Sequence, residues 1–251
     1  MNAARRAAAV WMARAGDVWE TALDFLFPRH CAACDGMVDA PRGHLCDGCR
    51  LALVPVVPPF CVRCGDPVDG TVGGRFVCSL CAGEEPAFDL ARSAVRFRGP
   101  VRPLVHQFKY RDGLYLAGDL AGLLALCVET HYDANSVDLT AFVPLHRRRE
   151  RTRAYNQSRL LAERLGRRYG KPVLRGFRRV RDTGSQTRLS MAERARNVKN
   201  AFQVVDPAWV EGKTILLVDD VMTTGATLRE AARALKSAGA WRVMAATVAR
   251  G

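Results

Sequence analysis

The chain has 251 residues, enough for one large domain plus a small module and too many for a miniprotein held together by disulfides. Hydrophobic residues make up 49% and charged residues 25%, so wholesale disorder is excluded. The net charge of +13 is concentrated, because residues 145–200 hold 18 Lys or Arg against 4 Asp or Glu, a net +14. Such a segment indicates a polyanionic partner such as pyrophosphate, a nucleotide or nucleic acid.

Residues 1–28 are predicted to contain an amphipathic helix that ends at Pro28. Its apolar positions recur every three or four residues: Trp11, Ala15, Val18, Ala22 and Phe25. We expect it to dock on the rest of the chain, with a partner or a membrane surface as the alternative. Charged residues interrupt the apolar run, so neither a membrane span nor a cleavable signal fits, and a cytoplasmic location is expected.

The cysteines are grouped, since eight of the nine form four CxxC pairs. The pairs are Cys31/Cys34, Cys46/Cys49, Cys61/Cys64 and Cys78/Cys81. In an unsecreted chain such pairs indicate metal ligands rather than disulfides. The segment around them is rich in Gly and Pro and has no apolar periodicity, so a metal must organise it. The ninth, Cys127, lies in the apolar run LLALCV and is predicted to be a buried thiol.

Two CxxC turns complete a closed tetrahedral shell of four thiolates, so residues 29–85 are predicted to form a double zinc ribbon with two structural zinc ions. One ion or an iron–sulfur cluster is the alternative. The four pairs can combine in three ways, and pairing neighbours closes the shortest loops. We therefore place residues 31–49 around one ion and residues 61–81 around the other. His30 and His44 are expected to be surface histidines rather than ligands.

Beyond a boundary near residues 83–87, strand and helix patterns alternate, which predicts an α/β domain over residues 86–251. The predicted strands are 91–97, 139–144, 202–205, 214–219 and 242–248. The predicted helices are 100–110, 114–130, 156–169 and 226–238, and the basic stretch from 170 to 200 is expected to be irregular. The alternation predicts a mostly parallel sheet with helices on both faces.

The segment ILLVDDVMTTGAT at residues 215–227 combines a buried strand, two acids and a small-residue turn that opens a helix. Asp219 and Asp220 are expected at the carboxyl edge of the sheet, where they suit ribose hydroxyls or a water-coordinated Mg²⁺. The following residues can offer backbone N–H groups and hydroxyls to a phosphate: Thr223, Thr224, Gly225, Ala226 and Thr227. No Lys follows the Gly, so a nucleotide triphosphatase is disfavoured.

This segment resembles the signature of the type I phosphoribosyltransferases, whose loop holds the 5-phosphate of phosphoribosyl pyrophosphate (PRPP). The whole chain resembles the ComF family, which joins N-terminal zinc ribbons to such a domain and is linked to DNA uptake in natural transformation. Further likenesses are FKYRDG at residues 108–113, VPLHRRRERTRAYNQS at 143–158 and SQTRLSMAERARNVKNAF at 185–202. The resemblance covers nearly all of the chain after the first helix.

The resemblance implies specific roles for the basic segment. It places four arginines beside the pyrophosphate leaving group, ahead of a helix opened by Asn156: Arg147, Arg149, Arg151 and Arg153. Residues 175–200 resemble a hood that closes over the site, with four positions that match the family pattern: Gln186, Arg188, Arg194 and Asn197. Thr223 stands where purine-salvage relatives carry an acid, so the resemblance does not support a 6-oxopurine acceptor.

Two functions remain open from the sequence. One is Mg²⁺-dependent phosphoribosyl transfer from PRPP to a nucleophile that the sequence does not name. The other is a non-catalytic module that senses this ligand while the basic segment and zinc ribbons hold single-stranded DNA or a DNA-uptake helicase. Alternatively, the hood and the pyrophosphate contacts use all of the positive charge of residues 145–200, and the protein has no affinity for DNA. The spacing of the ribbons does not distinguish DNA from protein as their partner.

Overall fold

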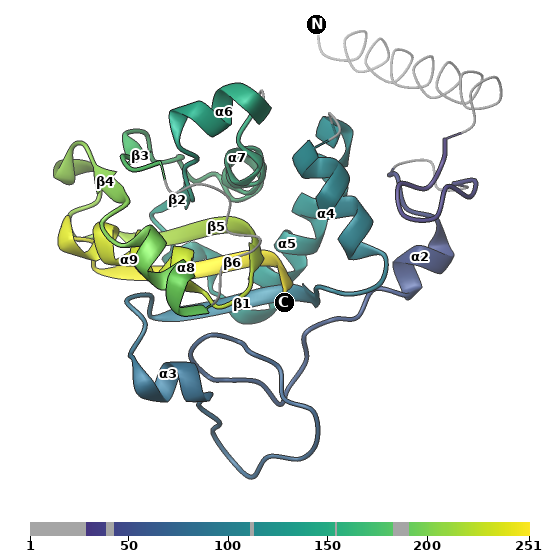
Figure 1. Ribbon diagram of the computed structural model, residues 1–251, viewed down its shortest axis with the longest axis horizontal. Helices are drawn as coiled ribbons and strands as arrows, with labels where there is room; N and C mark the ends of the chain where they lie inside the picture. The colour runs from purple at the N-terminus through teal and green to yellow at the C-terminus, as the bar shows by residue number, and fades with distance from the viewer. Residues whose placement is uncertain (1–28, 39–42, 111–112, 154, 183–190) are drawn as a thin grey trace, which may run out of the picture.

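The computed structural model describes residues 29–251 except 39–42, 111–112, 154 and 183–190 (Figure 1). The helix predicted within residues 1–28 lies outside this part. The central sheet has four parallel strands in the order β1-β6-β5-β2. Their bounds are β1 (Leu90–Arg96), β2 (Leu139–Phe142), β5 (Thr214–Met222) and β6 (Arg242–Arg250). The predicted parallel sheet is therefore confirmed.

The two central strands are buried on both faces, as continuous apolar runs in a parallel sheet should be. All but the first residue of β6 is buried, and β5 is buried continuously from Thr214 to Val218. Leu217 of β5 lies opposite Ala245 of β6 and Ala141 of β2, which fixes the register across the sheet.

Helices cover both faces of the sheet (Figure 1). One face carries α5 (Ala117–His131) and α7 (Gln157–Tyr169), with α4 (Val101–Tyr110) in the same core. The other face carries α9 (Ala226–Ser237), against which α8 (Met191–Val198) packs. The 3-10 turns span Gly113–Leu116, Ala134–Ser136 and Pro207–Trp209.

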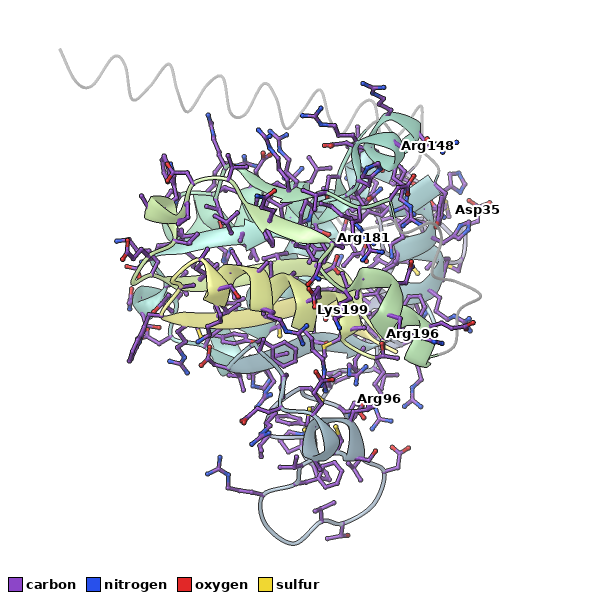
Figure 2. The ribbon with its side chains drawn as sticks, turned by 60° about the vertical axis from the view of Figure 1, so that its left-hand side comes forward. Asp35, Arg96, Arg148, Arg181, Arg196 and Lys199 are labelled. Atoms are coloured by element: carbon purple, nitrogen blue, oxygen red, sulfur yellow. The ribbon has the colours of Figure 1, made fainter. Side chains whose placement is uncertain are left out.

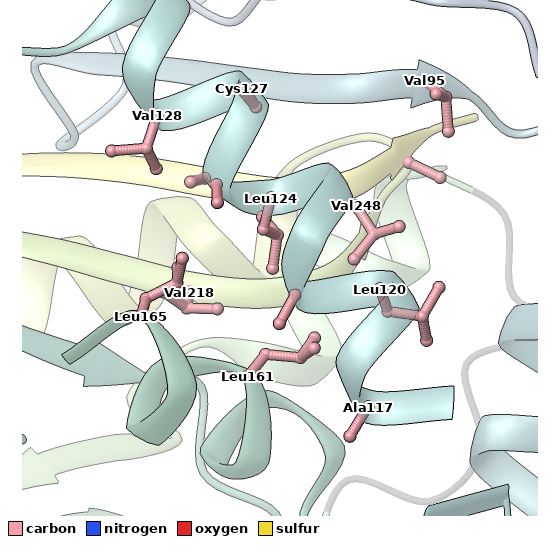
Figure 3. Packing of buried hydrophobic residues seen from close by; sticks show 14 of the residues in the cluster. Val95, Ala117, Leu120, Leu124, Cys127, Val128, Leu161, Leu165, Val218 and Val248 are labelled. Carbon is pink, nitrogen blue, oxygen red and sulfur yellow. The ribbon is translucent and has the colours of Figure 1, made fainter. Parts of the chain in front are cut away.

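The core of the first face lies between α5, α7 and the sheet (Figure 3). Leu120 and Leu124 of α5 are fully buried and face Val218 and Val248 of the central strands. By length and composition the segment Gly113–His131 could span a membrane. Its packing against the sheet explains why a segment within the core is so apolar. Half of that segment is buried inside the protein.

Several predicted elements differ from the structure in extent. The stretch expected to be irregular contains β3 (Phe177–Arg179) and α8, and β3 pairs antiparallel with β4 (Phe202–Val204) outside the main sheet. The arginines expected ahead of the helix opened by Asn156 form a helix of their own, α6 (Arg147–Arg153). In addition, β5 runs past Asp219 to Met222, so the acid pair belongs to the strand itself.

The two cysteine-rich units contact opposite faces of the domain (Figure 1). The first includes α2 (Asp47–Leu51), and its backbone at Ala32 accepts a hydrogen bond of 2.6 Å from Gln107 of α4. The second includes α3 (Ser79–Gly83), and its Arg63 carbonyl accepts from the backbone N–H of Ala91 in β1 at 2.8 Å. The chain between them bridges to β1 at Pro55, so it covers that edge of the sheet.

Candidate functional site

Eight cysteine sulfurs form two groups, Cys31/Cys34/Cys46/Cys49 and Cys61/Cys64/Cys78/Cys81, and within each group all four sulfurs lie within 4.8 Å of one another. This is the grouping that neighbour pairing predicted. A tetrahedral zinc site with Zn–S bonds of about 2.3 Å places its sulfurs about 3.8 Å apart. The contacts Cys34–Cys46 at 3.7 Å and Cys64–Cys78 at 3.5 Å match that spacing. Both groups therefore fit structural zinc.

In each group, backbone hydrogen bonds lower the pKa of one thiol, whereas the pKa values of Cys34, Cys49, Cys64 and Cys81 are raised. Burial opposes ionisation, but hydrogen bonds from nearby backbone N–H groups lower the pKa of Cys31 to about 6 and that of Cys61 to about 7. In contrast, burial raises the pKa of Cys127 to about 12, as expected for the buried thiol that the sequence predicted. Cys127 is a buried residue of α5 in the core of the first face and belongs to neither cysteine group.

The acid pair lies near the carboxyl end of β5, held by two helices of the first face. The Ser158 hydroxyl in the first turn of α7 donates to Asp219 Oδ1 at 2.7 Å, and the backbone N–H of Asp220 donates to the same oxygen at 2.9 Å. Asp220 is 6% exposed, and its Oδ1 forms an ion pair of 2.8 Å with Lys109 Nζ at the end of α4. Ser158 and Lys109 thus orient the two carboxyl groups.

The environment of Asp219 shifts its pKa. Burial, reinforced by the neighbouring charge of Asp220, raises the pKa of Asp219 to about 7, although Ser158 and Lys109 oppose the shift. A carboxyl group with a pKa near neutrality, close to the carboxyl end of a parallel strand, is a candidate functional group.

The turn at residues 223–225 connects β5 to the N-terminus of α9. Gly225 precedes α9 with a φ of 76°, a left-handed backbone conformation that favours glycine over residues with a Cβ. The N-terminus of α9 adds N–H groups that lack helical partners and a positive dipole. Thr224 Oγ1 accepts from the N–H of Ala226 at 3.4 Å, while Thr223 is exposed and Thr227 is half-buried in the first turn.

The arginines of α6 separate into two faces. Arg149 and Arg153 lie one turn apart and are half-buried, whereas Arg147 and Arg151 are exposed. Arg153 donates to the Tyr110 hydroxyl at 2.9 Å and stacks over its ring. Burial lowers the pKa of Arg149, and the charge of Arg153 adds to that effect.

A residue that the sequence did not single out completes this basic cluster. Arg179 at the end of β3 is buried, and burial together with the charge of Arg149 lowers its pKa to about 10. The charge of Asp219 acts in the opposite direction, so Arg179 lies within electrostatic reach of both Asp219 and Arg149 of α6. A cleft of about 440 Å³ runs between α6 and β3 and is lined by Arg147 and Arg179.

The hood positions are described only in part. Gln186 and Arg188, like Arg111 and Asp112 of the FKYRDG motif, lie outside the described residues, as does the side chain of Arg194. Asn197 is half-buried on α8. The chain after α8 is fixed to α9, because the Asn200 N–H donates to Glu230 Oε1 at 2.7 Å.

Exposed basic side chains continue beyond the cluster. Figure 2 shows Arg148 on α6, Arg181 after β3, and Lys199 and Arg196 at α8. All four are exposed, and Arg181 donates to the Lys199 carbonyl, which links the two segments. The basic segment of the sequence therefore forms a buried part beside the acid pair and an exposed part on the surface.

Cysteine clusters that fit zinc, a parallel α/β sheet and a strand–acid–glycine loop define a zinc-ribbon protein with a phosphoribosyltransferase-like domain. Family models agree: a double zinc ribbon domain matches residues 22–83 and a phosphoribosyl transferase domain matches residues 157–251. The chain belongs to the ComF family of competence-related proteins.

Similar curated proteins span most of the chain. Competence protein F of Haemophilus influenzae is 31% identical over 229 residues, which cover 89% of this chain and 98% of that protein. The DNA utilization protein YhgH of Escherichia coli K12 is 33% identical, covering 79% and 87%. Competence protein ComFC of Bacillus subtilis is 27% identical, covering 79% and 80%.

Among solved structures, the glutamine PRPP amidotransferase of B. subtilis is similar with a TM-score of 0.39 and 23% identity. The match covers 56% of this chain and 30% of the amidotransferase chain.

Proposed function

We propose that this protein binds PRPP at the carboxyl edge of its sheet. The loop at residues 223–227 would hold the 5-phosphate, and Asp219 and Asp220 would accept hydrogen bonds from the ribose hydroxyls. The arginines of α6, with Arg149 and Arg153 on the inner face, would contact the pyrophosphate. The observation that carries the proposal is the acid pair, oriented by Ser158 and Lys109 and followed directly by a glycine turn that opens a helix.

Breaking the bond between the ribose anomeric carbon and pyrophosphate transfers negative charge to the leaving group. Arg149 interacts electrostatically with Arg153 and with Arg179, and Arg179 also interacts with Asp219, so these arginines could stabilise that charge as it develops. Carboxylate oxygens are the ligands that Mg²⁺ prefers, so the acid pair suits the ion that the family resemblance implies. Held there, Mg²⁺ would supply further neutralisation of pyrophosphate charge.

Binding is tested by titrating the protein with PRPP and Mg²⁺ in a calorimeter and by thermal shift. A ligand at about 100 times its dissociation constant raises the free energy of unfolding by about 2.7 kcal/mol. The double variant D219N/D220N is expected to abolish this effect while the ligand-free protein remains folded. Equal affinity in wild type and variant would refute the site, and a large loss of melting temperature without ligand would make the acid pair structural.

Measuring turnover distinguishes phosphoribosyl transfer from non-catalytic sensing of PRPP. A phosphoribosyltransferase releases one pyrophosphate per nucleophile consumed, so pyrophosphate should appear only when an acceptor is added. We propose transfer as the activity and keep tight binding without turnover as the alternative. A screen of small nucleophiles with PRPP and Mg²⁺, read by pyrophosphate release, decides between them.

A second candidate function is weak binding of single-stranded DNA in the cytoplasm during DNA uptake, alone or with a helicase. It is favoured by the exposed arginines and lysine between α6 and α8, whose charges are accessible to a phosphate backbone. Few aromatic residues lie among them, so electrostatics rather than base stacking should dominate. We propose the domain bounds that the sequence suggested: a double zinc ribbon at residues 29–85 and a phosphoribosyltransferase-like domain at residues 86–251.

The DNA proposal predicts a steep salt dependence with little sequence preference. Each phosphate contact contributes about 0.7 to the slope of log affinity against log salt for a single strand. Fluorescence anisotropy with a labelled oligonucleotide, read across a salt series, measures that slope. Replacing Arg147, Arg148, Arg149, Arg151 and Arg153 with Ser should flatten it. Binding that survives these substitutions, or no binding at low salt, would remove the α6 arginines from this role.

A further inference from the structure

The second zinc ribbon, residues 61–81, packs against the helix that follows the phosphate loop. Its four cysteines are each at most 5% exposed and belong to one apolar cluster with Leu228 and Ala231 of α9. Three cysteines of the first ribbon, Cys31, Cys46 and Cys49, lie in or against the other cluster, on the α4 and α5 face. The two ribbons therefore differ in what they support.

Arg250, the last residue of β6, joins the second ribbon to the backbone that enters the loop. It is 5% exposed, and its Nη1 donates to the carbonyl oxygens of Met222 (3.1 Å), Thr223 and Gly251 (2.8 Å). Its Nη2 forms an ion pair of 2.8 Å with Asp66 Oδ1, two residues after Cys64. A buried guanidinium that loses its carboxylate partner reorganises, because the unpaired charge is costly to bury.

Arg229 joins the same ribbon to the backbone that leaves the loop. It lies in the first turns of α9, and its N–H donates to the Gly225 carbonyl at 2.8 Å. Its guanidinium donates to the carbonyl oxygens of Glu84 (2.8 Å) and Leu80 (3.2 Å) and to the sulfur of Cys81 at 3.5 Å. A donor to a ligand sulfur both orients that ligand and is itself oriented by the metal site.

We infer that the second zinc ribbon is a positioning element for the phosphate loop, acting through Arg250 and Arg229. Arg250, which is ion-paired with Asp66, holds the phosphate loop (residues 223–227) where the chain enters it. Arg229, which is hydrogen-bonded to the Cys81 sulfur, holds it where the chain leaves. Order in the loop then depends on the ribbon being folded around its metal. The consequence for ligand affinity rests on the proposed binding of PRPP, whereas the consequence for loop order does not.

The chain offers a matched control for the entry contact. Asp69 lies in the same ribbon and forms an ion pair of equal length, 2.8 Å, with Arg96 at the end of β1, but its side chain is 89% exposed. D66N and D69N therefore remove one carboxylate charge each, with little change in shape. Only D66N releases the arginine that holds the loop.

The direct readout is amide hydrogen exchange at residues 222–228 in the zinc-loaded, ligand-free protein. D66N is expected to accelerate exchange there by about tenfold or more, as for a lost hydrogen bond to a charged group, while D69N leaves it at the wild-type rate. Zinc content must stay equal in all three proteins. Equal loop exchange in D66N, D69N and wild type would overturn the inference.

A second pair of variants tests the exit contact in case D66N perturbs the ribbon. R229Q removes the donor to Cys81, whereas R233Q removes a half-exposed arginine on the same helix that bonds Glu84 and Glu230. Faster loop exchange in R229Q than in R233Q supports the inference, and identical exchange contradicts it.

The affinity readout separates the two proposals. If wild type binds PRPP, D66N and R229Q should weaken binding severalfold relative to D69N and R233Q. R250K should also bind PRPP more weakly than wild type, because Lys cannot span the same partners as Arg250. If wild type fails to bind PRPP, the proposed function is wrong, while the exchange comparison still decides the role of the ribbon.

Discussion

The two acids of β5 are neighbours in sequence but chemically unequal. Asp220 is paired with Lys109, whereas Asp219 accepts hydrogen bonds from Ser158 and from the backbone. The pKa of Asp219, about 7, means that this carboxyl group keeps its proton up to neutral pH in the ligand-free protein. Ribose hydroxyls donate hydrogen bonds and favour the ionised carboxylate, so the proposed ligand should release that proton on binding.

The pKa of Asp219 predicts how pH affects stability. In the unfolded chain this group ionises near its ordinary pKa of about 3.9, so between about pH 4 and 7 the folded protein holds a proton that the unfolded chain has lost. The free energy of unfolding contributed by Asp219 should therefore fall as pH rises through this window. D219N, which cannot ionise, should melt higher than wild type at pH 8, with the difference shrinking toward pH 5.

Melting temperatures of ligand-free wild type and D219N, measured by calorimetry across this pH range, check the prediction. A constant difference between the two proteins would show that Asp219 ionises normally. D119N is not a suitable control, because Asp119 bonds His44 of the first ribbon. D69N is suitable, because it removes a carboxylate that is 89% exposed, together with its ion pair to Arg96.

Sequence reasoning identified the acids but not the residues that orient them. The strand–acid–glycine pattern is local, so Asp219, Asp220 and Gly225 could be read from thirteen consecutive positions. Lys109, Ser158 and Arg179 reach the site through tertiary packing, and Arg179 lies in a three-residue strand too short to carry a periodic signal. The FKYRDG and NQS motifs that contain Lys109 and Ser158 were found by resemblance, without any indication of what these side chains contact.

At the scale of elements, the first turn of α7 positions the acid site. Asn156 caps this helix, since its side-chain oxygen accepts from the Arg159 N–H at 3.2 Å, and its Nδ2 donates to the Val143 carbonyl at 3.2 Å. The cap is 4% exposed, so both of its hydrogen bonds are shielded from water. The cap therefore holds the turn from which Ser158 reaches Asp219.

The cap predicts a measurable cost. N156A should lower the free energy of unfolding by about 2 kcal/mol, of which about 1 kcal/mol comes from the lost cap and the rest from the buried carbonyl left without its donor. Chemical denaturation measures this value. D133A, which removes the exposed cap of a 3-10 turn, should cost less. A loss in N156A no larger than in D133A would show that the cap does not hold the turn.

Elements with long, uninterrupted patterns were predicted closely. The sequence placed helices at 156–169 and 226–238, and the structure has Gln157–Tyr169 and Ala226–Ser237. Two short elements were missed: α6 is a row of arginines with no apolar face, and β3 has only three residues. The strand predicted at 202–205 is present as β4, but it pairs with β3 rather than joining the main sheet. That pair is stabilised by the contact between Phe177 and Phe202, whose ring centroids lie 5.8 Å apart.

At the scale of the whole molecule, the zinc-binding units are parts of the domain core rather than appendages. Cys31 and Leu45 pack in the cluster of α4 and α5, and Cys64 packs in the cluster of α9. The sequence suggested that zinc removal would unfold residues 31–81 and leave the remainder largely folded. Shared packing instead implies that loss of the second ion also weakens the domain, because the cluster beneath α9 would lose part of its contacts.

The difference between the two clusters gives a final prediction. Both C34A and C64A should reduce the zinc content of the purified protein from two ions per chain to about one, since a structural site tolerates no missing ligand. Cys34 is exposed, whereas Cys64 is 1% exposed among core residues, so C64A should lower the melting temperature by about 5 °C more than C34A. Elemental analysis and calorimetry on the same samples measure both quantities.

Three outcomes would contradict this account of the zinc sites. Iron in place of zinc, or well under two ions in wild type, would mean that the clusters hold something else. Unchanged protease resistance of residues 31–81 after chelation would mean that metal does not organise them. Equal melting temperatures in C34A and C64A would mean that the buried cluster contributes no more to the core than the exposed one.

Because the second ribbon also holds both ends of the phosphate loop, C64A should accelerate amide exchange at residues 222–228, and C34A should not.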